Sequence, residues 1–315
     1  MNSFQLRQYA LLFITAVIWG SGFIGQKLGM DHVSPYTFTF MRTFIGGLFL
    51  IPVILLRKRI LLRLGKKAQK SSPKMLLWGS ILCGSCLIAA ESFQQFGMIY
   101  TDVSKASFIT SLYVIFVPLI SVFIGSRPSL KIWLCTLAAA CGLYLLCIKD
   151  ELSLAAGDSL VLICAVIFAV HIMVIAYFVR FCDGVELSCG QFFVASALGL
   201  ILMLISGTDS AEDFMAAAPA FIYCGIMSNG VAYTLQIVGQ RGVNPVIATI
   251  ILSLESVMGT IFGVTILGDA LTSRQLLGCA LMFAAVVSSQ IPVALLLRSA
   301  LPIFRHSSDN DKIMR

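Results

Sequence analysis

The sequence contains few charged residues. Only 12% of its 315 residues are Asp, Glu, Lys or Arg, whereas 58% are hydrophobic. Because a soluble globular domain has roughly 25% charged residues, this chain lacks the polar surface that would keep a globule of its size in water. A helical bundle whose outer surface faces lipid needs no such surface. The composition therefore predicts an all-α integral membrane protein.

Sequence motifs of enzymes and of ATP-binding proteins are absent. The chain has three histidines, and His32 and His306 fall in a predicted loop and a predicted tail. It contains no H-E-x-x-H, G-x-S-x-G or G-x-x-x-x-G-K-[ST] sequence; these would indicate a metalloprotease, a serine hydrolase or a phosphate-binding loop. We therefore expect neither catalysis nor direct use of ATP, and no cofactor.

The ten cysteines do not indicate disulfides or a metal site. Most fall inside apolar runs, where cysteine behaves as a small buried hydrophobic residue. Cys83 and Cys86 have C-x-x-C spacing, but no second pair accompanies them, so a metal or redox site is disfavoured. The net charge of +7 is spread over short connections and the tail, so we expect no nucleic-acid partner.

Ten apolar runs are long enough to cross a bilayer, which requires about 20 mostly apolar residues. The first is too long for a signal peptide and others follow it, so we predict an uncleaved first span. The two longest connections are the basic stretch 57–74 and the acidic stretch 207–216. The predicted spans are 9–30, 36–56, 75–98, 101–124, 131–148, 157–180, 190–206, 217–238, 243–266 and 274–297.

The positive residues predict the orientation. With ten spans, most of the 22 Lys and Arg fall in the connections on the N-terminal side of the membrane, and acidic residues dominate the connections on the other side. Lys and Arg are retained on the cytoplasmic side of membrane proteins. We therefore predict a multi-pass protein of the cell inner (plasma) membrane with both termini in the cytoplasm. The exceptions are Lys27, Arg42, Lys105, Lys149 and Arg274.

The chain contains an internal repeat. A shift of 142 residues aligns polar and small residues of the predicted third to fifth spans with those of the eighth to tenth, without a gap. The predicted division is 1–148 and 149–297, followed by a cytoplasmic tail, 298–315. Each half has an odd number of spans, so the second half crosses the membrane in the opposite sense, which is typical of secondary transporters. The aligned pairs are Gln94 with Gln236, Gly97 with Gly239, Ala106 with Ala248, Ser111 with Ser253 and Leu112 with Leu254.

Short motifs of small, aromatic and polar residues are spread over residues 9–297. They are Trp19-Gly20-Ser21-Gly22-Phe23, Phe40-Met41-Arg42, Gln94-Gln95-Phe96-Gly97, Ala106-Ser107-Phe108-Ile109-Thr110-Ser111-Leu112-Tyr113-Val114, Tyr233-Thr234-Leu235-Gln236, Ser253-Leu254-Glu255-Ser256-Val257 and Leu267-Gly268-Asp269. In their order and spacing these motifs resemble those of permeases of the drug/metabolite transporter superfamily with two EamA-like domains. This resemblance implies a ten-helix bundle that transports small organic solutes such as amino acids, sugars or other metabolites.

The sequence departs from the family pattern at three places. Gly125-Ser126-Arg127 stands where Gly-Glu is usual, Asp269 replaces a usual Glu, and Glu91 occupies a position that is commonly small or uncharged. The resemblance therefore does not name the solute.

Arg42 and Glu91 are expected to meet inside the membrane. Each lies about seven residues from the outer end of its predicted helix, which places both roughly 10 Å below the outer edge at about 1.5 Å per residue. Ionisable residues in the bilayer are costly and face the bundle interior. Three roles remain open: an ion pair that joins two helices, a site for a zwitterionic or anionic solute, or a proton-linked carboxylate.

Glu255 and His171 form a second predicted pair. Each lies near the middle of its predicted span, and Glu255 is the most central carboxylate of the chain. Asp, Glu and His side chains form proton relays in transporters. We therefore predict that Glu255 binds a proton or the amino group of the solute, with His171 as its partner. The alternative is a structural hydrogen-bonded group.

Uncharged polar and aromatic residues complete the predicted site. Gln95 shares a helical stripe with Glu91, and Asn229 and Gln236 share one on the predicted eighth span. Trp19 and Tyr113 lie near the midplane, although aromatic residues of membrane helices more often pack in the core or face lipid. Gln94 belongs to the repeated motif. The predicted substrate-binding or coupling residues are Glu91, Gln94, Gln95, Arg42, Glu255, His171, Gln236, Asn229, Trp19 and Tyr113.

Together these features predict a secondary transporter of small organic metabolites, amino acids or related solutes, that works by alternating access. Family tendency favours export. Its predicted partners are the solute and the lipid bilayer, with proton coupling as one role of the buried carboxylates. The alternatives are a non-transporting membrane protein or an intramembrane enzyme. The sequence does not name the solute, the mode of coupling or the oligomeric state.

Overall fold

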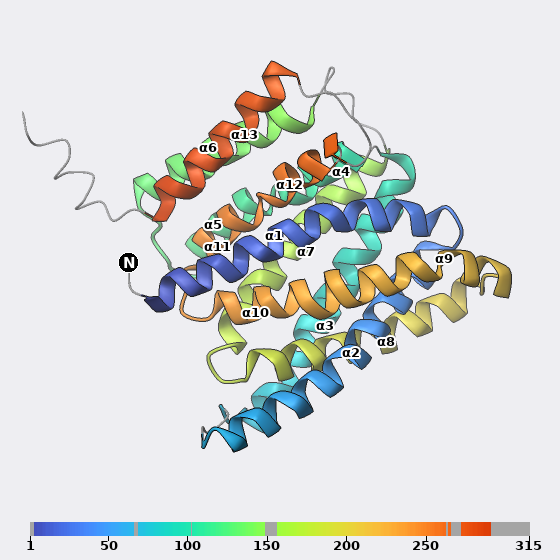
Figure 1. The fold of residues 1–315 in the computed structure, drawn as a ribbon. Coiled ribbons are helices and arrows are strands. Elements are labelled where there is room, and N and C mark those ends of the chain that lie inside the picture. The colour runs from blue at the N-terminus through green and yellow to red at the C-terminus, as the bar shows by residue number, and fades with distance from the viewer. Residues whose placement is uncertain are drawn as a thin grey trace, which may run out of the picture.

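The computed structural model describes residues 3–65, 69–101, 103–148, 156–262, 264–265 and 272–290. These residues form helices and short turns, with no strand among them (Figure 1). The elements are α1 (Ser3–Met30), α2 (Pro35–Arg63), α3 (Pro73–Tyr100), α4 (Val103–Ser111), α5 (Tyr113–Phe123), α6 (Leu130–Cys147), α7 (Ala156–Phe178), α8 (Gly184–Ser206), α9 (Ala211–Tyr223), the π-helix η1 (Cys224–Tyr233), α10 (Thr234–Gln240), α11 (Pro245–Leu252), α12 (Glu255–Phe262) and α13 (Ser273–Gln290).

Within the described residues, nine segments are long and apolar enough to cross a membrane. Three of these segments are composite, because α4 with α5, α9 to α10, and α11 with α12 each make one crossing. The tenth predicted span corresponds to α13. Polar residues such as Arg274 and Gln290 stand at the ends of its described part, and residues 291–297 lie outside the described ranges. The structure therefore confirms an all-α membrane fold.

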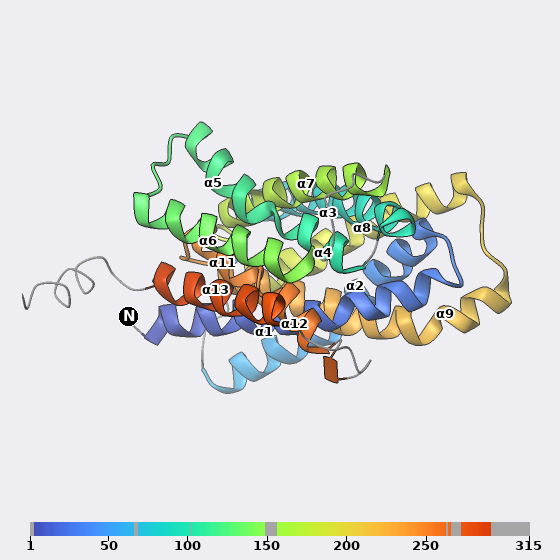
Figure 2. The same cartoon turned by 90° about the horizontal axis from the view of Figure 1, so that it is seen from above.

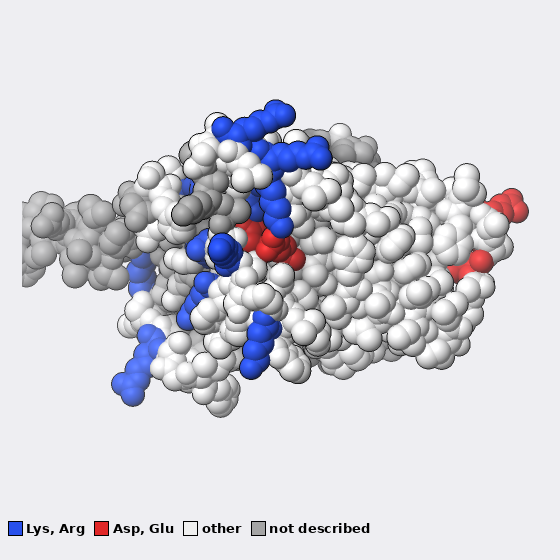
Figure 3. All heavy atoms as spheres, turned by 90° about the horizontal axis from the view of Figure 1, so that it is seen from below, with Lys and Arg blue, Asp and Glu red and all other residues white. Residues whose placement is uncertain are grey.

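The two ends of the bundle differ in charge. On the face seen in Figure 3, Lys and Arg gather at the end where α1 begins, around a small group of Asp and Glu side chains. Other exposed Asp and Glu side chains lie at the opposite end, and a broad belt without charge separates the two ends. We call these the basic end and the acidic end. The belt consists of exposed Leu, Ile, Phe and Val side chains, as expected where lipid tails surround the protein.

The five-helix halves pack as inverted copies. The third crossing of the first half, α3, packs along α7, the first crossing of the second half. In the reciprocal relation, α1 packs along α9, η1 and α10. The second crossings, α2 and α8, pack together, and so do the last ones, α6 and α13, which form a pair at one side of the bundle (Figures 1 and 2). Gly142 and Gly278 bring the latter pair close, because a Cβ on either glycine would lie under 3.0 Å from the other's carbonyl oxygen.

Several helix ends differ from the predicted boundaries for local reasons. The helix α2 continues through Arg63, so Arg57 and Lys58 lie on its last turns rather than in a loop. The helix α8 begins at Gly184, since the Asp183 carboxylate caps it by accepting from the N–H groups of Val185 and Glu186. Because these terminal turns contain polar residues, their hydropathy is low and the predicted spans did not include them.

Some predicted features fall on parts of the chain that the structure does not describe. They are the tail 298–315, the connection that includes Lys149, and Asp269 of the last motif.

Candidate functional site

Two helix breaks face each other in the centre of the bundle. The crossing formed by α4 and α5 is interrupted at Leu112, and that formed by α11 and α12 is interrupted at Ser253 and Leu254. At both breaks the backbone makes an i→i+3 hydrogen bond, from Leu112 N to Ile109 O and from Leu254 N to Ile251 O. These residues are related by the repeat's shift of 142, so the breaks are equivalent. Both crossings were predicted as continuous helices.

The breaks bring Tyr113 and Glu255 together. Each is the first residue of the helix that follows its break, and the two are themselves equivalent in the repeat. Tyr113 donates its hydroxyl to Glu255 Oε1 at 3.0 Å, and Ser111 donates to the same oxygen at 3.1 Å. Because Glu255 opens α12, its carboxylate also lies at the positive end of that helix's dipole.

Glu255 has no cationic partner among the described residues. The four ion pairs in these ranges involve other carboxylates, and the carboxyl group of Glu255 is almost fully buried. Its nearest donors are neutral hydroxyl groups. A buried carboxylate that lacks a counter-ion has affinity for a proton or for a cationic group of a ligand.

A cavity of about 40 Å³ lies beside this carboxylate. It has room for about three water molecules, at roughly 10–15 Å³ each. Six predicted site residues line it, and they come from both halves of the chain. These residues are Trp19, Arg42, Gln94, Tyr113, Gln236 and Glu255.

Arg42 and Glu91 form an ion pair on the cavity wall. Arg42 Nη2 lies 2.8 Å from Glu91 Oε1, and both side chains are almost completely buried. The structure therefore confirms that the two residues meet. Arg42 lines the cavity, whereas Glu91 lies behind it on α3. Tyr233 and Asn229 lie within hydrogen-bonding reach of the Glu91 carboxylate. By contrast, the Nε of Arg42 has no hydrogen-bond partner, so Arg42 retains capacity to bind a polar ligand or water.

The π-helix η1 decides which residues of the eighth crossing face the cavity. A π-helix has wider turns than an α-helix, and such segments occur often at functional sites. Ser228 and Tyr233 line the cavity, but Asn229 does not. The Asn229 side chain packs on α2, where a Cβ added to Gly46 would lie 2.9 Å from its own Cβ. The sequence-based prediction assumed a regular α-helix, which would place Asn229 and Gln236 on one face. The wider turns of η1 direct the two side chains differently.

Trp19 closes one side of the cavity through contacts with the same segment. Its indole N–H donates to Ser228 O at 3.4 Å, and its ring lies edge-on to that of Tyr233, with centroids 4.6 Å apart. These contacts join α1 to η1, so an element of each half contributes to this wall.

The two neighbouring glutamines of α3 have different partners. Gln94 lines the cavity and donates to Thr110 Oγ1 at 3.1 Å. Gln95 lies outside the cavity lining and donates to Gln26 Oε1 on α1 at 2.7 Å. Gln94 is thus placed for contact with a ligand, and Gln95 links two helices.

His171 does not pair with Glu255. Its Nε2 is 3.0 Å from Gln191 Oε1 on α8, and the ring is fully buried without lining the cavity. The predicted pair is wrong because equal depth does not fix the direction of a side chain. The helix α7 turns His171 toward α8, whereas the break before Glu255 turns the carboxylate toward α4 and α5.

Four polar cavity residues are not among the predicted site residues, namely Gln26, Thr110, Ser228 and Tyr233. Gln26 could have been found, because Trp19, Phe23 and Gln26 follow the spacing of one α-helical face. Ser228 could not, because a π-helix leaves no periodic signal in a single sequence.

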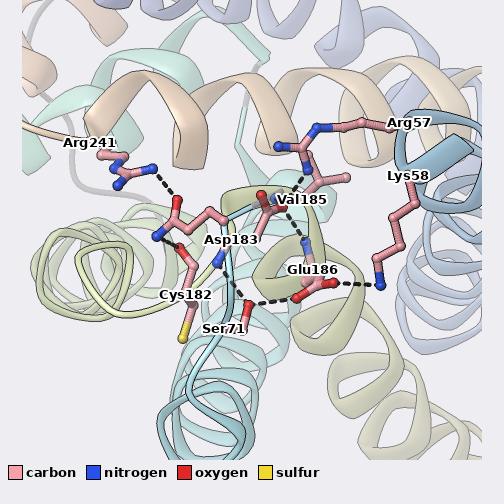
Figure 4. Close-up of polar contacts among 9 residues, drawn as sticks. Arg57, Lys58, Ser71, Cys182, Asp183, Val185, Glu186 and Arg241 are labelled. Carbon is pink, nitrogen blue, oxygen red and sulfur yellow. Dashed lines mark hydrogen bonds and ion pairs between the residues drawn. The ribbon is translucent and has the colours of Figure 1, made fainter. Parts of the chain in front are cut away.

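A polar network at the basic end joins α2, the start of α3 and the turn between α7 and α8 (Figure 4). Asp183 Oδ1 lies 2.8 Å from Arg57 Nη1, and Lys58 Nζ lies 2.8 Å from Glu186 Oε1. Ser71 accepts from Asp183 N and donates to Glu186 Oε2, at 2.9 and 2.6 Å. This network fixes the basic ends of the scaffold helices that surround the site.

We expect Asp183→Ala to lower the free energy of unfolding by about 1–2 kcal/mol, since loss of a helix cap costs about 0.5–2 kcal/mol. Asp183→Asn should cost less, because an amide oxygen can still cap α8 while the pair with half-exposed Arg57 is lost. Chemical unfolding in mixed micelles measures both values. Glu212→Ala, an exposed acidic residue in the first turn of α9, is the matched control. Equal losses for Asp183→Ala and Glu212→Ala would contradict a capping role.

Comparison with known proteins places the chain in a family. The model of the EamA-like transporter family matches it twice, over residues 6–148 and 155–289. An uncharacterized transporter of Archaeoglobus fulgidus is 29% identical over 277 residues, which are 88% of this chain and 83% of the relative. The uncharacterized transporter YoaV of Bacillus subtilis is 22% identical over 278 residues, or 86% of this chain and 92% of the relative.

A solved crystal structure shares the fold. It superimposes with a TM-score of 0.73 at 18% sequence identity, and the match covers 93% of this chain and 98% of the other. The membrane-spanning helices, the two matched halves and the relatives agree: this chain is a multi-pass membrane protein that belongs to the EamA-like transporter family.

Proposed function

We propose that the protein is a secondary transporter that exports amino acids or related small metabolites by alternating access. The central observation is the cavity that Arg42 and Glu255 line together, with Glu255 lacking a cationic partner among the described residues. A zwitterionic solute would place its carboxylate toward the guanidinium and its ammonium group toward Glu255. Gln94, Gln236 and the ring of Trp19 would complete its contacts.

The paired helix breaks support alternating access. They stand at equivalent positions of two inverted halves, and ligand sites of such transporters lie near the midplane where the halves meet. Rocking of one half against the other would enlarge the cavity toward one end of the bundle at a time. At about 40 Å³ the cavity is far below the roughly 300–1,000 Å³ of typical ligand sites, as expected for a closed arrangement.

Counterflow into liposomes tests this proposal. Purified protein is reconstituted into vesicles loaded with an unlabelled mixture of the common amino acids, and uptake of each labelled amino acid is followed without an ion gradient. We expect at least one amino acid to exchange faster than in protein-free vesicles. Vesicles with Arg42→Gln protein, matched for the amount of folded protein, are the control. Absence of exchange for every amino acid would reject the proposed solute class.

We further propose that the basic end faces the cytoplasm, since Lys and Arg concentrate there. Both termini should then be cytoplasmic. A fluorescent protein fused after Arg315 should fold and fluoresce, and alkaline phosphatase fused there should be inactive. Phosphatase inserted in the stretch 207–216 should be active and serves as the positive control. Active phosphatase at the C-terminus would indicate an odd number of spans.

A further inference from the structure

A second cavity lies at the basic end and is separate from the central one. It has a volume of about 560 Å³ and lies between α5, α7 and the start of α11. It shares no lining residue with the central cavity. The fully buried Val117 and Ile250 lie one helical turn deeper on α5 and α11. We call this cavity the α5–α7 groove.

The mouth of the groove is basic. Arg127 in the turn after α5 and Arg180 in the turn after α7 line it, and both side chains are exposed. Within the described ranges, neither guanidinium has a carboxylate within ion-pair distance. Arg180 Nε donates to Ala176 O at 3.1 Å, and this bond leaves the donors of the two terminal nitrogens available to a ligand. The mouth therefore carries two guanidinium groups that are not paired with a described carboxylate.

The walls of the groove are apolar and open sideways. Ile120 of α5 and Ile124, the residue that follows this helix, line the groove together with Val170 and Met173 of α7. Ile124 is 67% exposed and Tyr177, one turn from Met173, is 51% exposed, so the groove opens through the lipid-facing surface of the bundle. Figure 2 shows α5 and α7 as neighbours at this lipid-facing side of the bundle. A water-soluble anion would bind the mouth but would gain nothing from these walls.

We propose that the α5–α7 groove binds one anionic phospholipid. Its phosphate would bind Arg127 and Arg180, and one acyl chain would lie between Ile120 and Met173. Arginine is suited to phosphate, because its planar donors bind two oxygens at once. Basic pockets between transmembrane helices bind lipid headgroups. The volume lies within the roughly 300–1,000 Å³ of ligand pockets. An annular lipid contacts only the exposed apolar surface of the bundle, whereas this lipid would also bind the two arginines and the concave wall of the groove.

Native mass spectrometry tests the proposal. The purified full-length protein is given equal amounts of dioleoyl phosphatidylglycerol and dioleoyl phosphatidylcholine. We expect one phosphatidylglycerol to be retained with a preference of roughly 10- to 30-fold, because each basic residue favours anionic lipid by about a factor of five. The double variant Arg127→Gln and Arg180→Gln should lose this preference. Equal retention of both lipids by the wild-type protein would overturn the proposal.

The matched control removes two other arginines from the same end. Arg59 and Arg63 are exposed on the last turns of α2 and lie outside the groove. The variant Arg59→Gln and Arg63→Gln has the same net charge as the groove variant and should keep the preference. Equal loss in both variants would show general attraction to basic protein rather than a site.

Two further measurements separate a lipid from a free anion. Val174→Phe should fill the groove and abolish lipid retention while leaving both arginines in place. Inorganic phosphate at 10-fold excess over lipid should not displace phosphatidylglycerol, because phosphate lacks the acyl chain. Retention in Val174→Phe protein, or displacement by phosphate, would overturn the assignment. Thermal unfolding without added lipid should give equal midpoints for all variants, so that any loss of lipid is not a loss of fold.

Discussion

Glu255→Gln should abolish accumulation of the solute against a gradient while leaving the protein folded. The amide keeps an oxygen that can accept from Ser111 and Tyr113, which bond to the carboxylate at 3.1 and 3.0 Å. It loses the negative charge that no cation among the described residues neutralises. If the solute's amino group binds there, loss of this charge-assisted bond costs about 1.5–3 kcal/mol, or roughly 10- to 100-fold in affinity.

Counterflow distinguishes the two roles of Glu255. Exchange needs no proton gradient, so a carboxylate that only couples protons predicts that exchange survives in Glu255→Gln protein while gradient-driven accumulation is lost. A carboxylate that contacts the solute predicts that both are lost. Glu212→Gln, an exposed residue at the acidic end, controls for removal of one negative charge. A stable variant with both activities at the wild-type level would assign neither role to Glu255.

Glu91→Gln and Arg42→Gln should each destabilise the protein strongly. Removal of one partner leaves the other charge buried without compensation, which costs about 3–5 kcal/mol. The pair is 2.8 Å apart and almost inaccessible to bulk solvent, so a single substitution leaves the remaining charge in the protein interior. The double variant should be more stable than the sum of the single losses predicts, because it buries no uncompensated charge. Chemical unfolding in mixed micelles provides these free energies.

A distant arginine gives the control for this cycle. Arg274 lies on α13 with its guanidinium over the ring of Tyr144, 5.2 Å from the centroid. Glu91→Gln combined with Arg274→Gln should be additive. Additive losses for Glu91→Gln with Arg42→Gln as well would mean that the charges do not interact. Stability is the proper measure, since Arg42 also lines the cavity and its loss would impair transport whether or not the ion pair forms.

The sequence was sufficient to predict the depth of each polar residue in the membrane, but not the direction in which its side chain points. Arg42 and Glu91 were paired correctly by counting residues from helix ends, and the same count paired Glu255 with His171 incorrectly. The difference is that α2 and α3 are regular α-helices at these residues, while Glu255 follows a break. A break resets the rotation of all later side chains about the helix axis. Hydropathy does not register this change, because the residues on both sides remain apolar.

The sequence by itself determined the membrane class, the inverted repeat and the charge difference between the two ends. Each of these follows from a sum over many residues, such as the mean apolarity of a span or the charge of a connection. Only the tertiary structure decided which side chains share the cavity. That choice depends on single features, namely the paired breaks, the wide turns of η1 and the contact of His171 on α7 with Gln191 on α8. Packing between segments that are distant in the sequence stabilises these features, so a local sequence pattern does not predict them.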